Sequence, residues 1–148
     1  MKQKVLTRLS FISIFVALFL MVAMLAAPVS AANTATVTLL NPPADGVLVL
    51  AVGESYTFDI QVESDTPFLS AIALTDQYYP GRGVFFSGTD RIGSGTSGTL
   101  HLTITGKQPS ATAQNVVDGL LPVGIVVGVR YQGGYAEQTR FDFTVIVE

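Results

Sequence analysis

Apolar and polar residues alternate strictly along three stretches of the chain. The clearest stretch is Tyr56-Thr57-Phe58-Asp59-Ile60-Gln61-Val62-Glu63, in which every even position is apolar and every odd position is polar. Residues 99–105 and 140–145 repeat this pattern. Because successive side chains of a β-strand point to opposite faces, a period of two predicts a half-buried strand at each stretch. The inward-facing residues expected of the first strand are Tyr56, Phe58, Ile60 and Val62.

Less regular apolar runs predict four more strands, at residues 35–40, 47–52, 68–75 and 124–131. The last run is rich in Val and Ile on both faces, which is typical of a strand in the centre of its sheet. Pro, Gly, Asn and Asp separate the runs at the spacing expected of a sandwich. One short helix is predicted at residues 111–118. Seven or eight short antiparallel strands favour an all-β fold with two packed sheets, and a closed barrel is the alternative.

The last two strands of the chain allow a prediction of register. A two-residue Gly133-Gly134 loop would place Val127 opposite Arg140, so that core and solvent faces mix. A three-residue loop of residues 133–135 would pair Val127 with Phe141 and Ile125 with Phe143. Since a slip of one residue reverses every side chain, hydrophobic matching favours the three-residue loop, with a glycine in the left-handed conformation.

The first 31 residues have the composition of a targeting segment. Three basic residues precede an uncharged apolar run at residues 11–27, and Pro28-Val29-Ser30-Ala31 follows it. These parts predict a helical signal peptide cleaved between Ala31 and Ala32, which leaves residues 32–148 as a single domain. The alternative is an uncleaved anchor, which would contact the membrane only through residues 9–27. Both interpretations predict a secreted or cell-surface domain.

Removal of the signal changes the charge of the protein. The whole chain has a net charge of −3, but three basic and no acidic residues leave with residues 1–31. The remaining 117 residues carry 5 Lys+Arg against 11 Asp+Glu, a net charge of −6. Nucleic acid is therefore excluded as an expected partner, because its phosphates require clustered cations. The chain has no Cys, so neither a lipid-modified cysteine nor a disulfide is available, and the core alone must stabilise the domain.

Two segments near the start of this domain resemble a known family. Val37-Thr38-Leu39-Leu40-Asn41-Pro42-Pro43-Ala44-Asp45-Gly46, followed by Val52-Gly53-Glu54-Ser55-Tyr56-Thr57-Phe58, resembles the opening of bacterial extracellular immunoglobulin-like and fibronectin III-like domains. The closing strand at residues 140–148 is similar to their last strand. The resemblance implies an immunoglobulin-like sandwich with an adhesive, accessory or structural setting, and it implies no catalytic residues. The Cys-Trp-Cys core of antibody domains is absent from the sequence.

Residues that could carry chemistry are few. The single histidine, His101, falls on the polar face of its strand, where a solvated surface residue is expected and a metal site would need further ligands. The carboxylate pairs Glu63/Asp65 and Asp76/Asp90 are of the residue type that serves glycosidases or binds calcium. Aspartates in loops also bond to local backbone, which is the simpler interpretation. We therefore predict no catalytic residue, no metal and no cofactor.

The segment at residues 76–98 is the most distinctive connection in the chain. It is long and glycine-rich, and long loops on a rigid scaffold commonly carry binding residues. A platform for a sugar or a protein would use Tyr78, Tyr79, Arg82, Phe85 and Phe86. The competing interpretation is that one phenylalanine begins a further strand and the tyrosines cover an open end of the sandwich.

The sequence as a whole predicts an exported, non-catalytic binding or structural domain. Its expected partner is an extracellular protein or glycan, held by loop aromatics or by an exposed sheet edge that accepts a strand. Two alternatives belong to other classes. One is a carbohydrate-binding module that uses the aromatics at residues 78–86, and the other is a small secreted hydrolase that uses Asp76 and Asp90.

Overall fold

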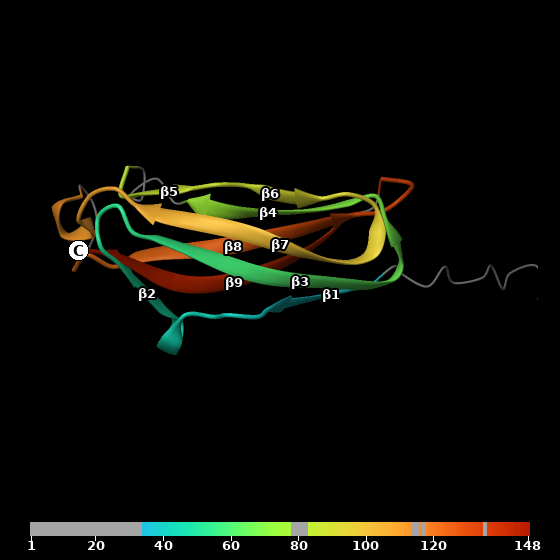
Figure 1. The fold of residues 1–148 in the computed structure, drawn as a ribbon, viewed down its shortest axis with the longest axis horizontal. Helices are drawn as coiled ribbons and strands as arrows, with labels where there is room; N and C mark the ends of the chain where they lie inside the picture. The colour runs from blue at the N-terminus through green and yellow to red at the C-terminus, as the bar shows by residue number, and fades with distance from the viewer. Residues whose placement is uncertain (1–33, 78–82, 114–115, 117, 135) are drawn as a thin grey trace, which may run out of the picture. The chain divides into compact units, whose positions relative to one another are not determined.

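The alternating stretches form β-strands that pair into two facing sheets (Figure 1). The structure is a computed structural model, and it describes residues 34–77, 83–113, 116, 118–134 and 136–148. The strands are β1 (Ala35–Leu39), β2 (Val47–Leu50), β3 (Ser55–Phe68), β4 (Ser70–Gln77), β5 (Phe85–Ser87), β6 (Asp90–Ile92), β7 (Gly95–Gly106), β8 (Leu121–Arg130) and β9 (Ala136–Val147). One sheet has four strands in the order β1-β3-β7-β5, and the other has five in the order β2-β9-β8-β4-β6. The predicted all-β sandwich is confirmed.

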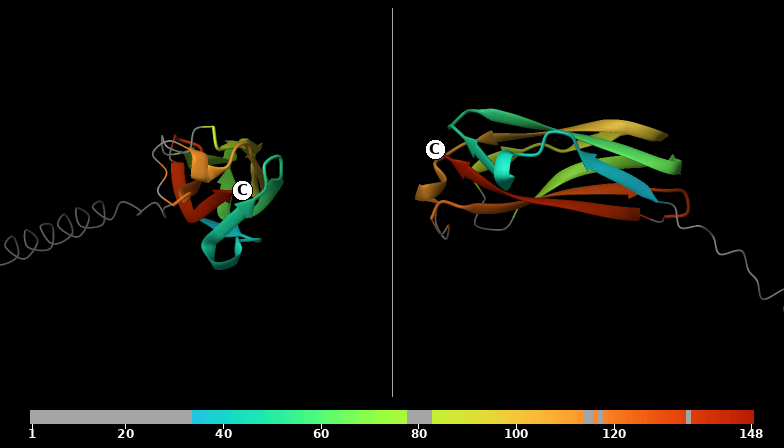
Figure 2. Two further views of the ribbon diagram at one scale, coloured as in Figure 1. Left: turned by 90° about the vertical axis from the view of Figure 1, so that its left-hand side faces the viewer. Right: turned by 90° about the horizontal axis from the view of Figure 1, so that it is seen from below.

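The core lies between the two sheets, as the alternation predicts. Phe58, Ile60 and Val62 of β3 are fully buried and face the interior, together with Leu100, Leu102 and Ile104 of β7. In the opposite layer the buried residues of β8 and β9 complete the core, and the Phe58 and Phe143 rings lie 5.0 Å apart between centroids. β8 is paired on both edges, with β4 and with β9, which confirms the central position that its Val- and Ile-rich sequence predicts. Figure 2 shows β3 and β7 in one layer and β8 and β9 in the other.

Two segments change from one sheet to the other. The first corresponds to two predicted strands, whereas the second lies in the predicted connection at residues 76–98 and adds β5 and β6, so nine strands are described instead of seven or eight. The first segment pairs as β1 with β3, antiparallel, and then as β2 with β9, parallel. Pro42 and Pro43 separate the halves, and neither can donate the backbone hydrogen bond that a continuing ladder needs. The second segment pairs as β5 with β7 and then as β6 with β4. Between its two pairings, each segment has no strand partner for a few residues.

Side chains fill the vacated positions on the strands that lose a partner. Where β1 leaves β3, the Asn41 side-chain amide donates to the Thr57 carbonyl, and its oxygen accepts from the Asp59 backbone N–H, both at 2.8 Å. Where β5 leaves β7, the Asp90 carboxylate accepts from the His101 backbone N–H at 2.6 Å and from the Arg91 N–H at 2.8 Å. An Asn or Asp side chain thus replaces strand backbone at each change of sheet.

Replacing Asp90 with alanine is expected to lower the free energy of unfolding by about 1–2 kcal/mol, because the His101 N–H loses its acceptor. Urea denaturation measures the loss, and amide hydrogen exchange at His101 should accelerate. Asp90→Asn keeps a side-chain oxygen in the same place and should retain most of the protection. Unchanged exchange at His101 in Asp90→Ala would contradict the role of this carboxylate.

The register of the last hairpin differs from the prediction by two residues. Arg130 pairs with Ala136, so the loop spans residues 131–135, and Ile125 lies opposite Phe141 while Val123 lies opposite Phe143. The faces match as expected, because a shift of two residues preserves the side to which each side chain points. The loop is two residues longer than predicted, and its first residue, Tyr131, is buried in the core. Gly133 and Gly134 have φ of 92° and 84°, the predicted left-handed conformation.

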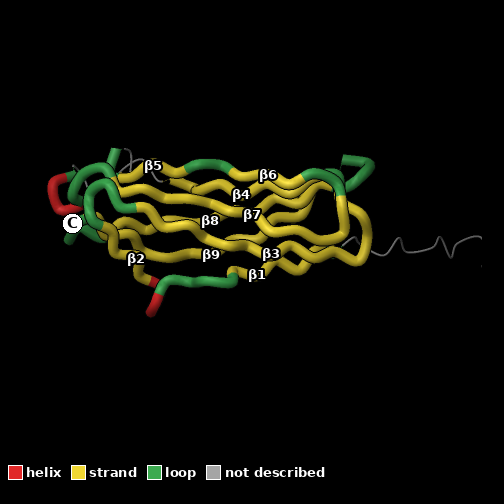
Figure 3. Tube along the Cα trace, in the orientation of Figure 1, coloured by secondary structure: helices red, strands yellow, loops and turns green. Residues whose placement is uncertain are grey.

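The helix predicted at residues 111–118 is absent from the described part of that range. Ser110–Thr112 form the short 3-10 turn η3, Ala113 is extended with φ −76° and ψ 137°, and Asp118 has φ 54°. The other short 3-10 turn, η1, spans Ala44–Gly46 before β2. Figure 3 shows the strands as the dominant elements of the described chain. Among the described residues, none belongs to a helix long and apolar enough to cross a membrane. The predicted signal segment, with Ala31 and Ala32, lies outside the described residues.

Candidate functional site

The predicted aromatic platform is only partly placed by the structure. Tyr78, Tyr79 and Arg82 lie outside the described residues. Phe85 and Phe86 are neighbours on β5 and point to opposite faces, so Phe85 is 3% exposed in the core whereas Phe86 is 57% exposed. Burial removes Phe85 from the predicted platform, because a ring in the core cannot meet a ligand. The binding roles predicted for the other four residues stay predictions.

Phe86 already has a partner on its ring. The Lys107 Nζ lies 5.3 Å from the ring centroid, a cation–π contact. Backbone hydrogen bonds from Lys107 and Gln108 to the Val84 carbonyl bring this segment alongside β5. One face of the exposed ring is therefore occupied by a side chain of the protein itself.

The outer face of the four-stranded sheet carries a ladder of polar pairs between β3 and β7. Hydrogen bonds join Ser55 to Thr105 at 2.7 Å and Thr57 to Thr103 at 2.8 Å, and Thr99 donates to Gln61 at 3.0 Å. Cross-strand pairs of this kind stabilise a sheet by tenths of a kcal/mol to about 1 kcal/mol each. The polar side chains of this ladder hydrogen-bond to one another, so we assign the ladder a structural role.

His101 belongs to the same ladder. Its Nδ1 lies 2.7 Å from Oδ1 of Asp59, directly across the strand pair, and the two side chains are 60% and 43% exposed. The surface position predicted for this histidine is confirmed. No hydroxyl group of a described residue hydrogen-bonds its ring, so the arrangement of a Ser-His-Asp triad is absent from that part of the chain.

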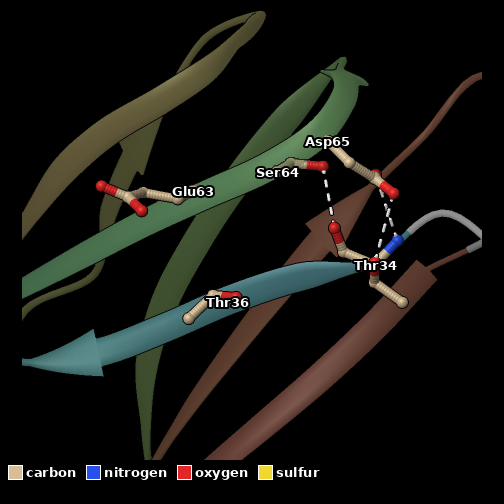
Figure 4. Close-up of a pocket in the computed structure, with 5 residues that line it drawn as sticks. All are labelled: Thr34, Thr36, Glu63, Ser64 and Asp65. Atoms are coloured by element: carbon tan, nitrogen blue, oxygen red, sulfur yellow. Dashed lines mark hydrogen bonds between the residues drawn. The ribbon is translucent and has the colours of Figure 1, made fainter.

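The structure separates one of the two predicted carboxylate pairs and places the other at one pocket. Asp90 lies opposite Ala73, whose side chain is buried, and Asp76 lies three residues further along β4 and so points to the other face. Asp65 accepts from the Thr34 N–H and hydroxyl at 3.4 and 3.3 Å. Figure 4 shows Glu63 pointing away from it. Asp76 and Asp90 therefore have no shared reaction space of the kind that a glycosidase needs. Glu63 and Asp65 line one open pocket of about 270 Å³ with Thr34, Thr36 and Ser64, but their carboxylates point apart in it. No group of three ligating side chains gathers for a metal within the described ranges.

An ion network that the sequence analysis did not predict lies on the outer face of the five-stranded sheet. Arg140 of β9 donates from Nη1 to Asp76 of β4 at 2.5 Å and from Nε to Asp142 at 2.7 Å. Gly124 of β8 is paired with both aspartates, one on each side. A Cβ at this position would lie 2.5 Å from the Arg140 Cζ, so the glycine provides the space in which the guanidinium lies on the sheet.

The network is one cation between two carboxylates. The hydrogen bonds that Arg140 donates to Asp76 and to Asp142 raise the pKa of its guanidinium above the ordinary value. A glycine inside a strand often marks the close approach of another group, which is the sequence signal for this contact. This signal is weak, because a strand glycine does not indicate which side chain approaches it.

Aliphatic side chains surround the network. Ile72 and Leu74 alternate with the buried Ala71 and Ala73 along β4 and are each 36% exposed. On the edge strand β2, Val47 and Val49 are 37% and 50% exposed on the same outer face. The outer face of the five-stranded sheet is therefore more apolar than the hydroxyl-rich face opposite.

No protein-family model and no curated protein matches the chain. Among solved structures, it is similar to the crystal structure of the periplasmic chaperone SfaE, with 11% identity and a TM-score of 0.45. The match covers 78% of this chain and 57% of the chaperone, so this chain spans a little over half the length of that protein. It is also similar to a chain from a structure of T cell activation by the bacterial superantigen toxic shock syndrome toxin-1, with 14% identity, a TM-score of 0.39, and coverage of 78% and 100%.

Proposed function

We propose that this protein is an exported immunoglobulin-like domain that binds or spaces other molecules and performs no catalysis of its own. Its four-stranded sheet, β1-β3-β7-β5, corresponds in connectivity to strands A, B, E and D of an immunoglobulin domain. Strands β4, β8 and β9 correspond to C, F and G of the second sheet. The fold assignment rests on this strand order together with the resemblance of residues 37–58.

The observation that carries the binding role is the outer face of the five-stranded sheet. Ile72 and Leu74 stand there beside the Arg140 network, and the network neutralises part of its own charge. Exposed apolar groups beside hydrogen-bonded polar groups are typical of a protein interface. The opposite outer face offers mainly hydroxyl groups that already bond to one another.

The proposed export rests on residues 1–31. A basic start, an apolar run and the Ala31-Ala32 junction are the parts of a secretory signal. The absence of cysteine is compatible with either side of a membrane, so it does not bear on the location. N-terminal sequencing of the product outside the cell should begin at Ala32, and a product that remains in the cytoplasm would contradict export.

A surface-retention assay tests the binding role. We expect the full chain, labelled and added to the cells that produce it, to stay on their surface. Leu74→Asp places a charge in the proposed interface and should reduce retention at least about tenfold, because unpaired charge is costly at a buried contact. The matched control is Thr57→Asp on the opposite outer face. Equal retention of the two variants, with both folded by circular dichroism, would overturn the proposed interface.

A further inference from the structure

A shallow depression crosses four strands at one end of the outer face of the five-stranded sheet. Its volume is about 300 Å³, and Ile72 of β4 and Gly128 of β8 form its apolar floor. Arg91 of β6 and Arg130 of β8 stand at its rim, with Gln138 of β9 beside them. The depression is separate from the Arg140 network, which lies further along the same sheet.

Strand register explains why these residues meet. Arg91 lies opposite Ile72, Ile72 lies opposite Gly128, and Gly128 lies opposite Gln138, so the four form one row across the sheet. Arg130 is two residues from Gly128 and therefore points to the same face, about 7 Å along the strand. Because Gly128 has no side chain, the row is lowest at its centre, and both arginines border this low point.

The charges at the depression are unusual for this domain. Of the five basic residues after residue 31, Arg140 is paired with two aspartates and Lys107 lies over the Phe86 ring. Arg82 lies outside the described residues. The side chains of Arg91 and Arg130 form no ion pair or hydrogen bond with any described residue. A domain with a net charge of −6 thus leaves two arginines uncompensated at one apolar depression.

We propose that this depression binds an extended acidic peptide segment of a partner protein. A carboxylate of the segment would accept hydrogen bonds from Arg91 and Arg130, since guanidinium groups match carboxylates in shape and charge. A neighbouring aliphatic side chain would pack on Ile72 and over Gly128. The proposal rests on the binding function above and specifies the chemistry of the partner.

The floor favours a peptide over an acidic polysaccharide. A sugar ring presents a flat C–H face, which packs best on a flat aromatic side chain. The described residues that line the depression include no aromatic residue, and the apolar ones are aliphatic or glycine. An aliphatic side chain of a peptide is the better match to such a floor.

Fluorescence anisotropy with the full chain tests the proposal. The probe is a labelled, capped hexapeptide that alternates Val and Glu, and the comparison peptide carries Gln in place of each Glu. We expect the acidic peptide to bind at least tenfold more tightly than the Gln peptide, with an affinity that falls as salt rises. An unlabelled oligogalacturonate is added as a competitor of the labelled peptide. Tighter binding of the oligogalacturonate than of the acidic peptide would overturn the peptide assignment in favour of a polysaccharide.

Three variants locate the binding. Arg91→Gln and Arg130→Gln should each weaken the acidic peptide at least about fivefold, whereas Lys107→Gln removes an equal charge elsewhere and should leave the affinity unchanged. Gly128→Val fills the floor without altering charge and should also weaken binding. A Cβ at Gly128 would lie 3.6 Å from the Ile72 Cγ2, an ordinary contact, so this strand position accepts a side chain. An equal loss in Lys107→Gln, or no loss in the two arginine variants, would overturn the site.

The surface-retention assay separates this proposal from the function on which it rests. If Arg91→Gln and Arg130→Gln are retained like the unaltered chain while Leu74→Asp is released, the acidic-peptide site is wrong and the binding function stands. If Leu74→Asp is also retained, the proposed interface itself fails. Release of all three variants supports both proposals.

Discussion

Replacing Phe58 with alanine is expected to lower the free energy of unfolding by about 4 kcal/mol. Phe58 is fully buried, and its ring contacts Tyr56 edge-on at 4.9 Å and Phe143 at 5.0 Å between centroids. Alanine loses the buried apolar area and leaves a cavity between the sheets, because strands held by their hydrogen-bond ladders collapse only partly. A domain of this size has a total stability of about 5–15 kcal/mol, so the loss is a large fraction of it.

Urea denaturation followed by far-ultraviolet circular dichroism measures this change. Phe86→Ala is the matched control, because it deletes the same atoms from a ring that is 57% exposed. Its expected cost is below about 1 kcal/mol, mainly the cation–π contact with Lys107. Similar losses for the two phenylalanines would contradict the assignment of Phe58 to the core and of Phe86 to the outer surface.

Gly106→Ala is expected to destabilise the domain by about 1–3 kcal/mol through overpacking. A Cβ at Gly106 would lie 2.8 Å from the Ala51 carbonyl oxygen and 2.9 Å from the Val147 Cγ1. The carbonyl belongs to the backbone and cannot rotate away as a side chain would. The same glycine accepts from the Gly53 N–H and donates to the Glu54 carbonyl, at 2.9 and 3.0 Å, so its own position is held as well.

A second glycine substitution provides the control for backbone effects. Gly128 is also a strand glycine, within β8 instead of at the end of β7, but a Cβ there would meet only the Ile72 Cγ2 at an ordinary 3.6 Å. The effect of Gly128→Ala should be neutral or slightly stabilising, since alanine loses less conformational entropy on folding than glycine. A comparable loss in both variants would show that strand glycines in this domain are sensitive for a reason other than the close approach at Gly106.

The local pattern of the sequence predicted seven of the nine described strands, but it did not predict β5 and β6 or which strands are adjacent. Alternation around Phe58 and around Leu102 identifies the buried face, because it depends only on the twofold period of a strand. The last hairpin shows the limit of this reasoning. Hydrophobic matching excludes the register that mixes faces, but registers that differ by two residues have the same faces, so alternation cannot choose between them.

The changes of sheet were not predictable for a related reason. Asn41 and Asp90 have the composition of ordinary loop residues, yet each replaces a missing strand on a neighbour distant in sequence. The helix predicted at residues 111–118 fails in the described part because a weak local preference gives way to the turn that joins β7 to β8. Asp76 and Asp90 appear as a pair in the sequence, but Asp90 of β6 is paired with Ala73 of β4, so it faces the side of the sheet opposite to Asp76.

The sequence by itself determined the class of the protein, an all-β domain, and the residues that face its core. It also predicted an export signal before this domain. These features follow from residue order within one element, where period and composition carry the information. Only the tertiary structure decided which strands are adjacent, and therefore that Arg140 reaches Asp76 over Gly124 and that Arg91 and Arg130 border one depression. Such contacts join residues from three or four strands that are distant in the sequence. These strands become adjacent only when the whole core packs, so no single element contains the information.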